Sequence, residues 1–127
     1  HLVADYFSDN LFFEISERPS RLVTSIAVLY DLQDPRAFVK GVKQILHPEG
    51  VWHFEQSYMP AMLRMNSYDT VCHEHLEYYS LQVVKDLVEK YDLKIIDVQM
   101  NSVNGGSFAV TVAKKNSATA GKCFYRR

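Results

Sequence analysis

The sequence is poor in cysteine and has no surplus of either charge. Its two cysteines, Cys72 and Cys123, lie far apart and outside any CxxC pair, which argues against a disulfide framework and against a zinc knuckle. Fourteen Lys and Arg residues are balanced by fifteen Asp and Glu residues, so the net charge of −1 lacks the basic surplus that binding to a phosphate backbone requires. We expect a reduced, cytoplasmic protein that binds no nucleic acid.

Long apolar runs are also missing. The apolar stretches have the length of strands, well below the roughly 18 residues of a membrane-spanning helix, and the N-terminus lacks the basic and apolar blocks of a signal peptide. Hydrophobic residues nevertheless make up 47% of the 127 residues and charged residues 23%, which is typical of one globular domain. We therefore expect a soluble domain that has no membrane as a partner.

The hydrophobic pattern predicts a parallel βαβ unit. Residues 22–30 are almost continuously apolar and β-branched, as in a strand that is covered on both faces. Asp34 and Pro35 are the expected N-cap and first-turn residues of a helix, and a second strand is expected over residues 51–58. Because ligands bind at the carboxyl ends of parallel strands, the residues that end these two strands are candidates for a site.

Turn signals and shorter patterns predict the rest of the chain. The expected elements are a strand over residues 2–7, a helix after residues 8–10, a helix after Ser80, and strands over residues 94–98 and 107–113. The last two strands are expected to form an antiparallel hairpin, and residues 59–79 a functional loop, because they are dense in polar and aromatic groups. The fold class is therefore α/β, with a folded part over residues 1–115 and a linker or tail over residues 116–127.

The densest titratable cluster is His73-Glu74-His75, which Asp69 and Cys72 precede. A histidine beside a carboxylate favours acid–base catalysis, since the carboxylate orients the ring and stabilises the imidazolium. Two histidines and a cysteine could also bind zinc, although their spacing is not that of an HExxH helix. The same residues could instead order the loop through hydrogen bonds, or Cys72 could act as a nucleophile, for which the sequence shows no activating group.

Three further groups of residues could contact a ligand or serve the fold alone. Asp31 follows the first buried strand and faces either the ligand crevice or its own turn. Tyr79 could stack on a ligand or fill the edge of the core. Asn104, Gly105 and Gly106 could bring backbone amides close to a ligand or form a hairpin turn.

Four short motifs follow one another in a recognisable order. They are LYDL at residues 29–32, LHPEG at residues 46–50, YDTVCHEH at residues 68–75 and NGGS at residues 104–107. Together they resemble the S-adenosylmethionine-dependent sugar C-methyltransferases, which act on nucleotide-linked 4-keto-deoxysugars. The resemblance implies a partial Rossmann-like class I methyltransferase fold, S-adenosylmethionine as the cofactor and a nucleotide-linked keto-sugar as the substrate.

The resemblance also implies roles for individual residues. His75 would be the base that removes the proton alpha to the ketone, with Glu74 and Asp31 as further catalytic residues. The implied substrate-binding residues are Cys72, Tyr79, Asn104, Gly105 and Gly106, the implied cofactor-binding residue is Tyr30, and no metal is implied. The chain departs from the family pattern at Cys72, where a tyrosine is expected, and at Asp31, where some members have a histidine.

The sequence contains neither a glycine-rich loop after a first strand nor the acidic residue that would bind ribose hydroxyls. We therefore expect the back half of a catalytic domain, inactive by itself. Its exposed sheet edge is expected to pair with another strand, and a homo-oligomer is one way to provide it. Two other functions remain open: an O- or N-methyltransferase of the same fold acting on another small molecule, and a noncatalytic interaction fragment.

Overall fold

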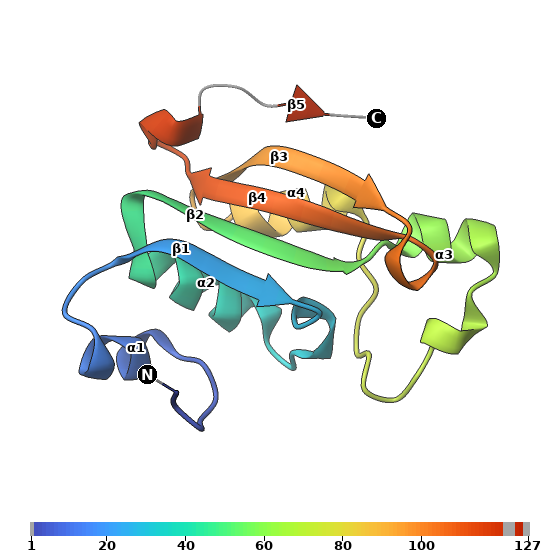
Figure 1. The fold of residues 1–127 in the computed structure, drawn as a ribbon, viewed down its shortest axis with the longest axis horizontal. Coiled ribbons are helices and arrows are strands. Elements are labelled where there is room, and N and C mark those ends of the chain that lie inside the picture. Colours follow the sequence, from blue (N-terminus) through green and yellow to red (C-terminus); the bar gives the residue numbers. More distant parts are fainter. Residues whose placement is uncertain (1, 121–123, 126–127) are drawn as a thin grey trace.

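The computed structural model describes residues 2–120, 124 and 125, and it confirms the α/β class (Figure 1). Its helices are α1 (Asp9–Ile15), α2 (Pro35–Ile45), α3 (Met59–Met65) and α4 (Leu81–Glu89), and its 3₁₀ turns are η1 (Leu29–Asp31), η2 (Tyr68–Thr70), η3 (Val103–Gly105) and η4 (Ala118–Ala120). Its strands are β1 (Ser20–Ile26), β2 (Leu46–Ser57), β3 (Leu93–Asn101), β4 (Ser107–Lys114) and β5 (Phe124–Tyr125). Helices α2 and α4 cover one face of the sheet.

Among the described residues the strands form one sheet in the order β1-β2-β4-β3-β5. Strand β1 runs parallel to β2, with Val23 opposite Trp52, which confirms the predicted βαβ unit. Strands β3 and β4 form the predicted antiparallel hairpin, and β4 also pairs with β2 in antiparallel register. The last long strand therefore lies inside the sheet and joins its two halves.

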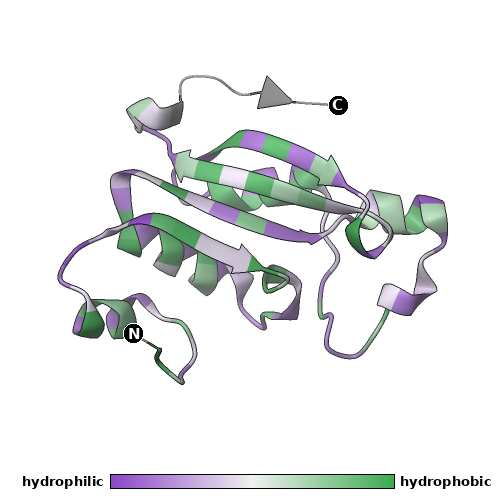
Figure 2. Ribbon diagram, in the orientation of Figure 1, coloured by the Kyte–Doolittle hydropathy of each residue, from purple (hydrophilic) through white to green (hydrophobic). Residues whose placement is uncertain are grey.

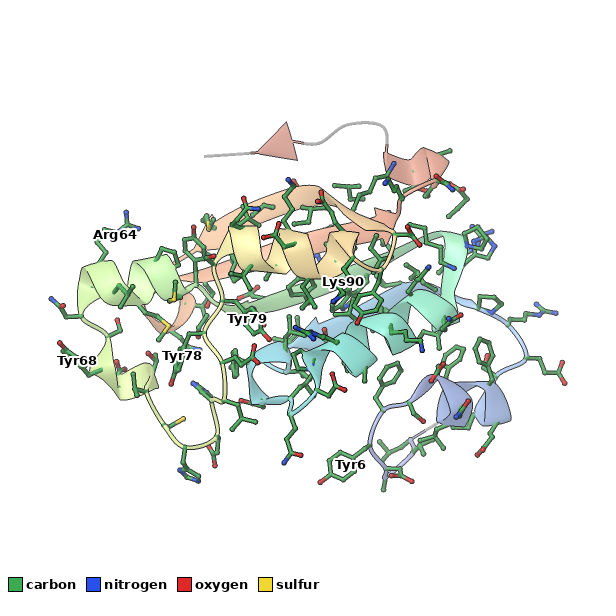
Figure 3. All side chains as sticks on the ribbon, turned by 180° about the vertical axis from the view of Figure 1, so that it is seen from behind. Tyr6, Arg64, Tyr68, Tyr78, Tyr79 and Lys90 are labelled. Atoms are coloured by element: carbon green, nitrogen blue, oxygen red, sulfur yellow. The ribbon has the colours of Figure 1, made fainter. Side chains whose placement is uncertain are left out.

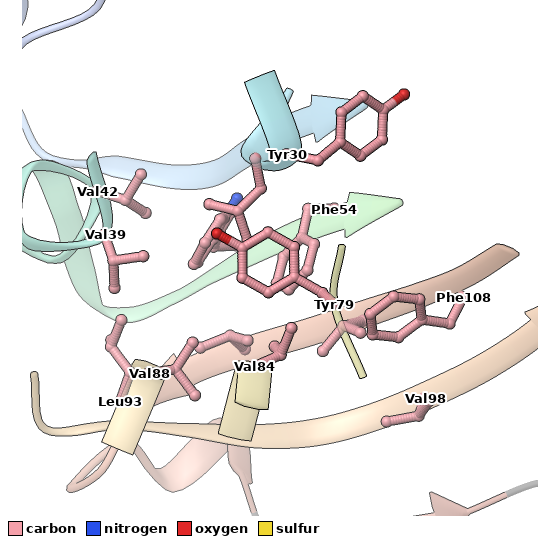
Figure 4. Packing of buried hydrophobic residues seen from close by; sticks show 14 of the residues in the cluster. Tyr30, Val39, Val42, Phe54, Tyr79, Val84, Val88, Leu93, Val98 and Phe108 are labelled. Carbon is pink, nitrogen blue, oxygen red and sulfur yellow. The ribbon is translucent and has the colours of Figure 1, made fainter. Parts of the chain in front are cut away.

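The core lies between the sheet and helices α2 and α4 (Figure 4). Its largest side chains are Trp52 and Phe54 from β2 and Phe108 from β4, packed with valines such as Val39 of α2 and Val84 of α4. Along most of β3 hydrophobic and hydrophilic residues alternate, because successive side chains of a strand point to opposite faces, whereas β4 is hydrophobic over most of its length (Figure 2). Each buried side chain of this size stabilises the fold by about 1.5–3 kcal/mol.

The opposite face of the sheet is more exposed. Leu22 and Ile26 of β1 are 59% and 57% exposed, and His53 and Thr111 form a hydrogen bond across β2 and β4 at 3.0 Å. Within the described residues β1 pairs with β2 on one side and has no strand on the other, as expected for a free sheet edge. The helices of the described part are too short or too polar to cross a bilayer.

Hydrogen-bonded caps confirm the three predicted helix starts. The side chains of Ser8, Asp34 and Ser80 each accept a hydrogen bond from the backbone N–H three residues further on, at 3.2, 2.9 and 3.4 Å. Such a cap satisfies an amide that the helix itself leaves without an acceptor.

Two predicted strands are corrected. Residues 2–7 form no strand, and Phe7 instead packs edge-on against Phe38 of α2, with ring centroids 5.2 Å apart. The strand predicted over residues 22–30 ends at Ile26, because Ala27 adopts a left-handed conformation with φ of 55° and turns the chain into η1.

The segment 59–79 is less irregular than predicted, because it begins with α3. Pro60 lies in the first turn of this helix, where its missing N–H costs nothing, and Asn66 ends the helix in a left-handed conformation with φ of 52°. The rest of the segment is a loop interrupted by η2.

The chain beyond β4 remains attached to the sheet through Glu49, which lies in the first part of β2. The Glu49 carboxylate accepts hydrogen bonds from the hydroxyl groups of Ser117 and Thr119 at 3.1 and 3.0 Å, and from the backbone N–H of Thr119 at 3.1 Å. These hydrogen bonds hold the pKa of the Glu49 carboxyl below its ordinary value. Residues 117–119 are thereby held beside β2, within the segment predicted to be a linker or tail.

Candidate functional site

The HEH motif forms a turn that separates its two histidines. The backbone N–H of His75 donates to the carbonyl of Cys72 at 3.3 Å, which leaves His73 and Glu74 at the tip. The side chains of His73 and Glu74 are 91% and 72% exposed and lie 3.8 Å apart. Consequently His75 is set apart from the other titratable groups of the motif, and Glu74 is on the solvent side of the turn.

The ring of His75 is fixed by its own loop. Its Nδ1 lies 2.8 Å from the carbonyl oxygen of Thr70. A carbonyl oxygen can only accept, so Nδ1 carries the hydrogen in the neutral ring, and Nε2 retains the lone pair. The ring also lies against Tyr30, with ring centroids 4.3 Å apart. His75 therefore has the tautomer and the support that a general base requires.

The His75 loop is attached to the carboxyl end of the first strand. The backbone N–H groups of Leu76 and Glu77 both donate to the carbonyl of Tyr30, at 2.9 and 3.2 Å. The residues that follow β1 and the residues of the HEH loop therefore meet beside the carboxyl end of β1. Asp31, the last residue of η1, is exposed beside this contact.

Tyr30 and Tyr79 differ in their surroundings. Tyr79 is 2% exposed and lies within the core cluster, whereas the ring of Tyr30 lies at its margin with the hydroxyl directed away (Figure 4). Burial raises the pKa of Tyr30, and the charges of Asp31 and Cys72 raise it further. Burial, followed by the nearby Glu77 carboxylate, raises the pKa of Tyr79 as well. Both phenols therefore stay protonated at neutral pH. Tyr79 occupies a core position, and its contact with substrate stays a prediction.

The glycine pair of the hairpin turn packs against the protein itself. Gly105 and Gly106 have φ of 76° and 134°, and Asn104 before them has φ of 50°. A Cβ on Gly106 would lie 2.5 Å from the Cβ of Ala61, and one on Gly105 would lie 2.8 Å from Oγ of Ser67. The pair thus has a structural role, because it allows the turn to pack closely on α3 and the residues that follow it. Its predicted contact with substrate stays a prediction.

A cavity of about 550 Å³ opens between α3 and the β3–β4 hairpin. The residues that line it are Tyr58, Ala61, Arg64, Met65, Met100, Asn101, Ser102, Gly105, Gly106 and Ser107. Arg64 extends away from the ribbon of α3 (Figure 3). The sequence predicts a loop over residues 59–79, whereas the structure places Arg64 on a helix. The first-turn proline and Asn66 are the signals that could have identified the helix.

Metal ligation finds no support in the described residues. No group of three or more His, Cys, Asp and Glu side chains within them is placed to hold a metal ion. Cys72 is a half-buried free thiol at the start of the HEH turn. The chemistry that the arrangement offers is proton transfer by His75.

Comparison with known sequences gives two matches. A family model described as a methyltransferase domain matches residues 5–98. The C-methyltransferase NovU of Streptomyces niveus is 34% identical over 94 residues, which are 74% of this chain and 22% of that protein. The chain thus spans about a fifth of the length of this curated relative.

Solved structures show a similar fold. The structure of LepI in complex with SAM superposes with a TM-score of 0.62 at 10% identity, covering 76% of this chain and 27% of LepI. The structure of TnmH superposes with a TM-score of 0.56 at 23% identity, covering 80% of this chain and 32% of TnmH. The structure of N-methyltransferase NodS from Bradyrhizobium japonicum WM9 superposes with a TM-score of 0.54 at 14% identity, covering 76% of this chain and 52% of NodS. At these identities the likeness shows the fold alone.

Proposed function

The chain belongs to the methyltransferase domain family and has its Rossmann-like class I fold, and from this premise we propose that it forms the acid–base part of an S-adenosylmethionine-dependent C-methyltransferase. The proposed substrate is a nucleotide-linked keto-deoxysugar. A base removes the proton from the carbon next to the ketone, and the enolate carbon then accepts the methyl group. The similarity to the C-methyltransferase NovU supports carbon as the acceptor, and the motifs at residues 68–75 and 104–107 support the sugar nucleotide.

The observation that carries the proposal is the geometry of His75. Its Nδ1 is occupied by the Thr70 carbonyl at 2.8 Å, so the Nε2 lone pair is available to remove a proton. Once the ring is protonated, the same carbonyl dipole stabilises the imidazolium. The nearby ring of Tyr30 limits rotation of the imidazole, because their centroids are 4.3 Å apart.

Glu74 and Asp31 remain the proposed catalytic neighbours, but neither acts by orienting the His75 ring. Thr70 already occupies the Nδ1 position of that ring. The exposed carboxylate of Glu74 is available to a substrate that lies over the turn, and Asp31 is exposed at the end of η1. We propose that both contact the sugar, where a carboxylate can accept hydrogen bonds from hydroxyl groups.

The described residues fit S-adenosylmethionine along one side. When bound, this cofactor supplies a methyl group on a positively charged sulfur. The backbone around Tyr30 lies at the carboxyl end of β1, and Val28 and Leu32 beside it line a cavity of about 460 Å³. Within the described residues, β1 is followed by η1 and not by a glycine-rich loop. We propose that residues outside this chain hold the ribose and adenine.

The test compares His75→Ala with His73→Ala in the full-length protein. His75→Ala should abolish solvent deuterium exchange at the carbon next to the ketone while cofactor binding stays near the wild-type level. His73→Ala is the matched control, because that histidine is 91% exposed at the tip of the turn. Undiminished exchange in His75→Ala would refute the assignment of the base.

A further inference from the structure

The ring that lies against the proposed base belongs to a tyrosine. Tyr30 and His75 have ring centroids 4.3 Å apart, with the two planes inclined at 51°. The ring of Tyr30 is held at the margin of the core, and its hydroxyl points away from that core (Figure 4). Its neighbours there are Asp31, which is exposed, and Cys72, which is half-buried. The phenol therefore ends near the surface, beside the start of the HEH turn.

Backbone hydrogen bonds fix the position of Tyr30 relative to His75. The carbonyl of Tyr30 accepts from the backbone N–H groups of the two residues that follow His75, at 2.9 and 3.2 Å. The turn η1 that carries Tyr30 is itself closed by a hydrogen bond from the N–H of Asp31 to the carbonyl of Val28 at 3.1 Å. The segments that carry the two rings are thus bonded to each other, so phenol and imidazole are arranged before a substrate arrives.

The phenol oxygen of Tyr30 and Nε2 of His75 are close enough for one ketone to contact both. Each atom lies on or just outside its own ring and the centroids are 4.3 Å apart, so the two atoms are at most about 8 Å from each other. A base at the α-carbon and a donor at the ketone oxygen each make a contact of roughly 3 Å. The α-carbon and the ketone oxygen are only two bonds apart, so the arrangement matches the reacting group.

Tyr30 is better placed to donate a hydrogen bond than the other tyrosines near His75. The ring of Tyr78 is further away, with centroids 6.3 Å apart, and Tyr79 is 2% exposed within the core. Burial, and after it the charge of Asp31, raises the pKa of the Tyr30 phenol. Asp31 acts here through its charge and not through a hydrogen bond. At neutral pH the hydroxyl therefore keeps its hydrogen and can donate it to a ligand.

We propose that Tyr30 is a further catalytic residue, whose hydroxyl donates a hydrogen bond to the ketone oxygen of the substrate; the inference rests on the proposed function. As His75 removes the α-proton, the electron pair of the C–H bond forms the C=C bond of the enolate, and a pair of the C=O bond moves onto the oxygen. Tyr30 stabilises this oxyanion and keeps its own proton. When the enolate carbon takes the methyl group, the pair returns and the C=O bond is restored.

Tyr30→Phe in the full-length protein removes the hydroxyl and retains the ring beside His75. We expect solvent deuterium exchange next to the ketone, and turnover, to fall by about 100-fold with little change in KM, because the donor binds the enolate more strongly than the ketone. Nitrogen-15 NMR should show the same His75 tautomer as in the wild type, since the Thr70 carbonyl still occupies Nδ1. Tyr78→Phe is the matched control and should exchange as the wild type does.

Infrared spectroscopy detects the hydrogen bond independently of the reaction. The probe is a thymidine diphosphate 4-keto-deoxysugar with carbon-13 at the ketone, because a hydrogen bond to the oxygen lowers the C=O stretching frequency. We expect a higher frequency in Tyr30→Phe than in the wild type, Tyr78→Phe or His75→Ala. Equal frequency and equal exchange in Tyr30→Phe and the wild type would overturn the role of Tyr30 and leave the proposed base in place. A frequency that depends on Tyr30, with exchange that persists in His75→Ala, would support the hydrogen bond and refute the proposed base.

Discussion

The carbonyl oxygen of Thr70 lies 2.8 Å from Nδ1 of His75, and this contact determines which nitrogen of the ring is able to accept a proton. The orientation of that carbonyl depends on η2, which the hydroxyl of Thr70 stabilises by donating to Ser67 at 2.8 Å. The Thr70 hydroxyl thereby helps to set the tautomer of the His75 ring.

We predict that Thr70→Val shifts His75 toward a mixture of tautomers and lowers turnover by roughly 10-fold, because the valine lacks the hydroxyl that holds η2. Thr70→Ser keeps the hydroxyl and should restore both properties. Nitrogen-15 NMR of the histidine ring reports the tautomer independently of activity. An unchanged tautomer in Thr70→Val would show that the hydroxyl has no part in positioning the ring.

Gly106 should be among the least replaceable residues of the hairpin. We predict that Gly106→Ala destabilises the fold by roughly 1–3 kcal/mol, because its φ of 134° is unfavourable for alanine and the new Cβ would meet the Cβ of Ala61. Chemical denaturation measures the loss. Adding Ala61→Gly should recover the part caused by the clash, and a double variant no more stable than Gly106→Ala would assign the whole loss to backbone strain.

The ionisation of Glu49 should make the free energy of unfolding depend on pH at low pH. Because hydrogen bonds from Thr119 and Ser117 lower its pKa in the folded state, its contribution is present above the ordinary carboxyl pKa of 4.5 and is lost as the pH falls through the lowered value. We predict that Glu49→Gln is less stable than the wild type near neutral pH and that the difference shrinks below about pH 4.5. Denaturation curves across this range decide it, with Glu14→Gln on α1 as a control. A difference that stays constant with pH would contradict the prediction.

The free edge of β1 should cause self-association. In the part of the chain that the structure describes, no strand lies on its outer side, where Leu22 and Ile26 are 59% and 57% exposed, and such an edge pairs readily with another strand. We predict that the 127-residue chain sediments as more than a monomer and that Leu22→Lys with Ile26→Lys reduces the association. Sedimentation at several concentrations measures this. A cooperative monomer with micromolar affinity for S-adenosylmethionine would show instead that this chain is complete as a domain.

Local chemistry explains which parts of the fold were predictable from the sequence. Ser8, Asp34 and Ser80 start helices through side chains that act within three residues, so their effect is visible in the sequence. Tertiary contacts determine features that the sequence does not reveal, such as the end of β1. Residues 28–30 have a strand composition, but β1 ends at Ile26, because η1 is held by the loop that carries His75.

In the candidate site, too, local chemistry is visible in the sequence and tertiary contacts are not. The residue pattern identifies the HEH cluster as a candidate for acid–base catalysis, since a histidine near a carboxylate is a chemical pattern, and the choice of His75 within it comes from the family resemblance. It could not show that a backbone carbonyl, rather than Glu74, occupies Nδ1, because that contact depends on the conformation of residues 67–75. The position of Arg64 beside the β3–β4 hairpin likewise depends on the three-dimensional fold.

The position of β4 between β2 and β3 also bears on how the chain folds as it is synthesised. Val51 of β2 pairs with Ala113 of β4, so the central ladder of the sheet joins residues about 60 positions apart. Strands β2 and β3 are not hydrogen-bonded to each other, and only β4, which pairs with both, connects them. Closing so long a loop is slow compared with forming the βαβ unit. Until residues 107–114 leave the ribosome, the two parts of the sheet remain separate. The last long strand to be made thus controls when Trp52 and Phe108 can enter a common core.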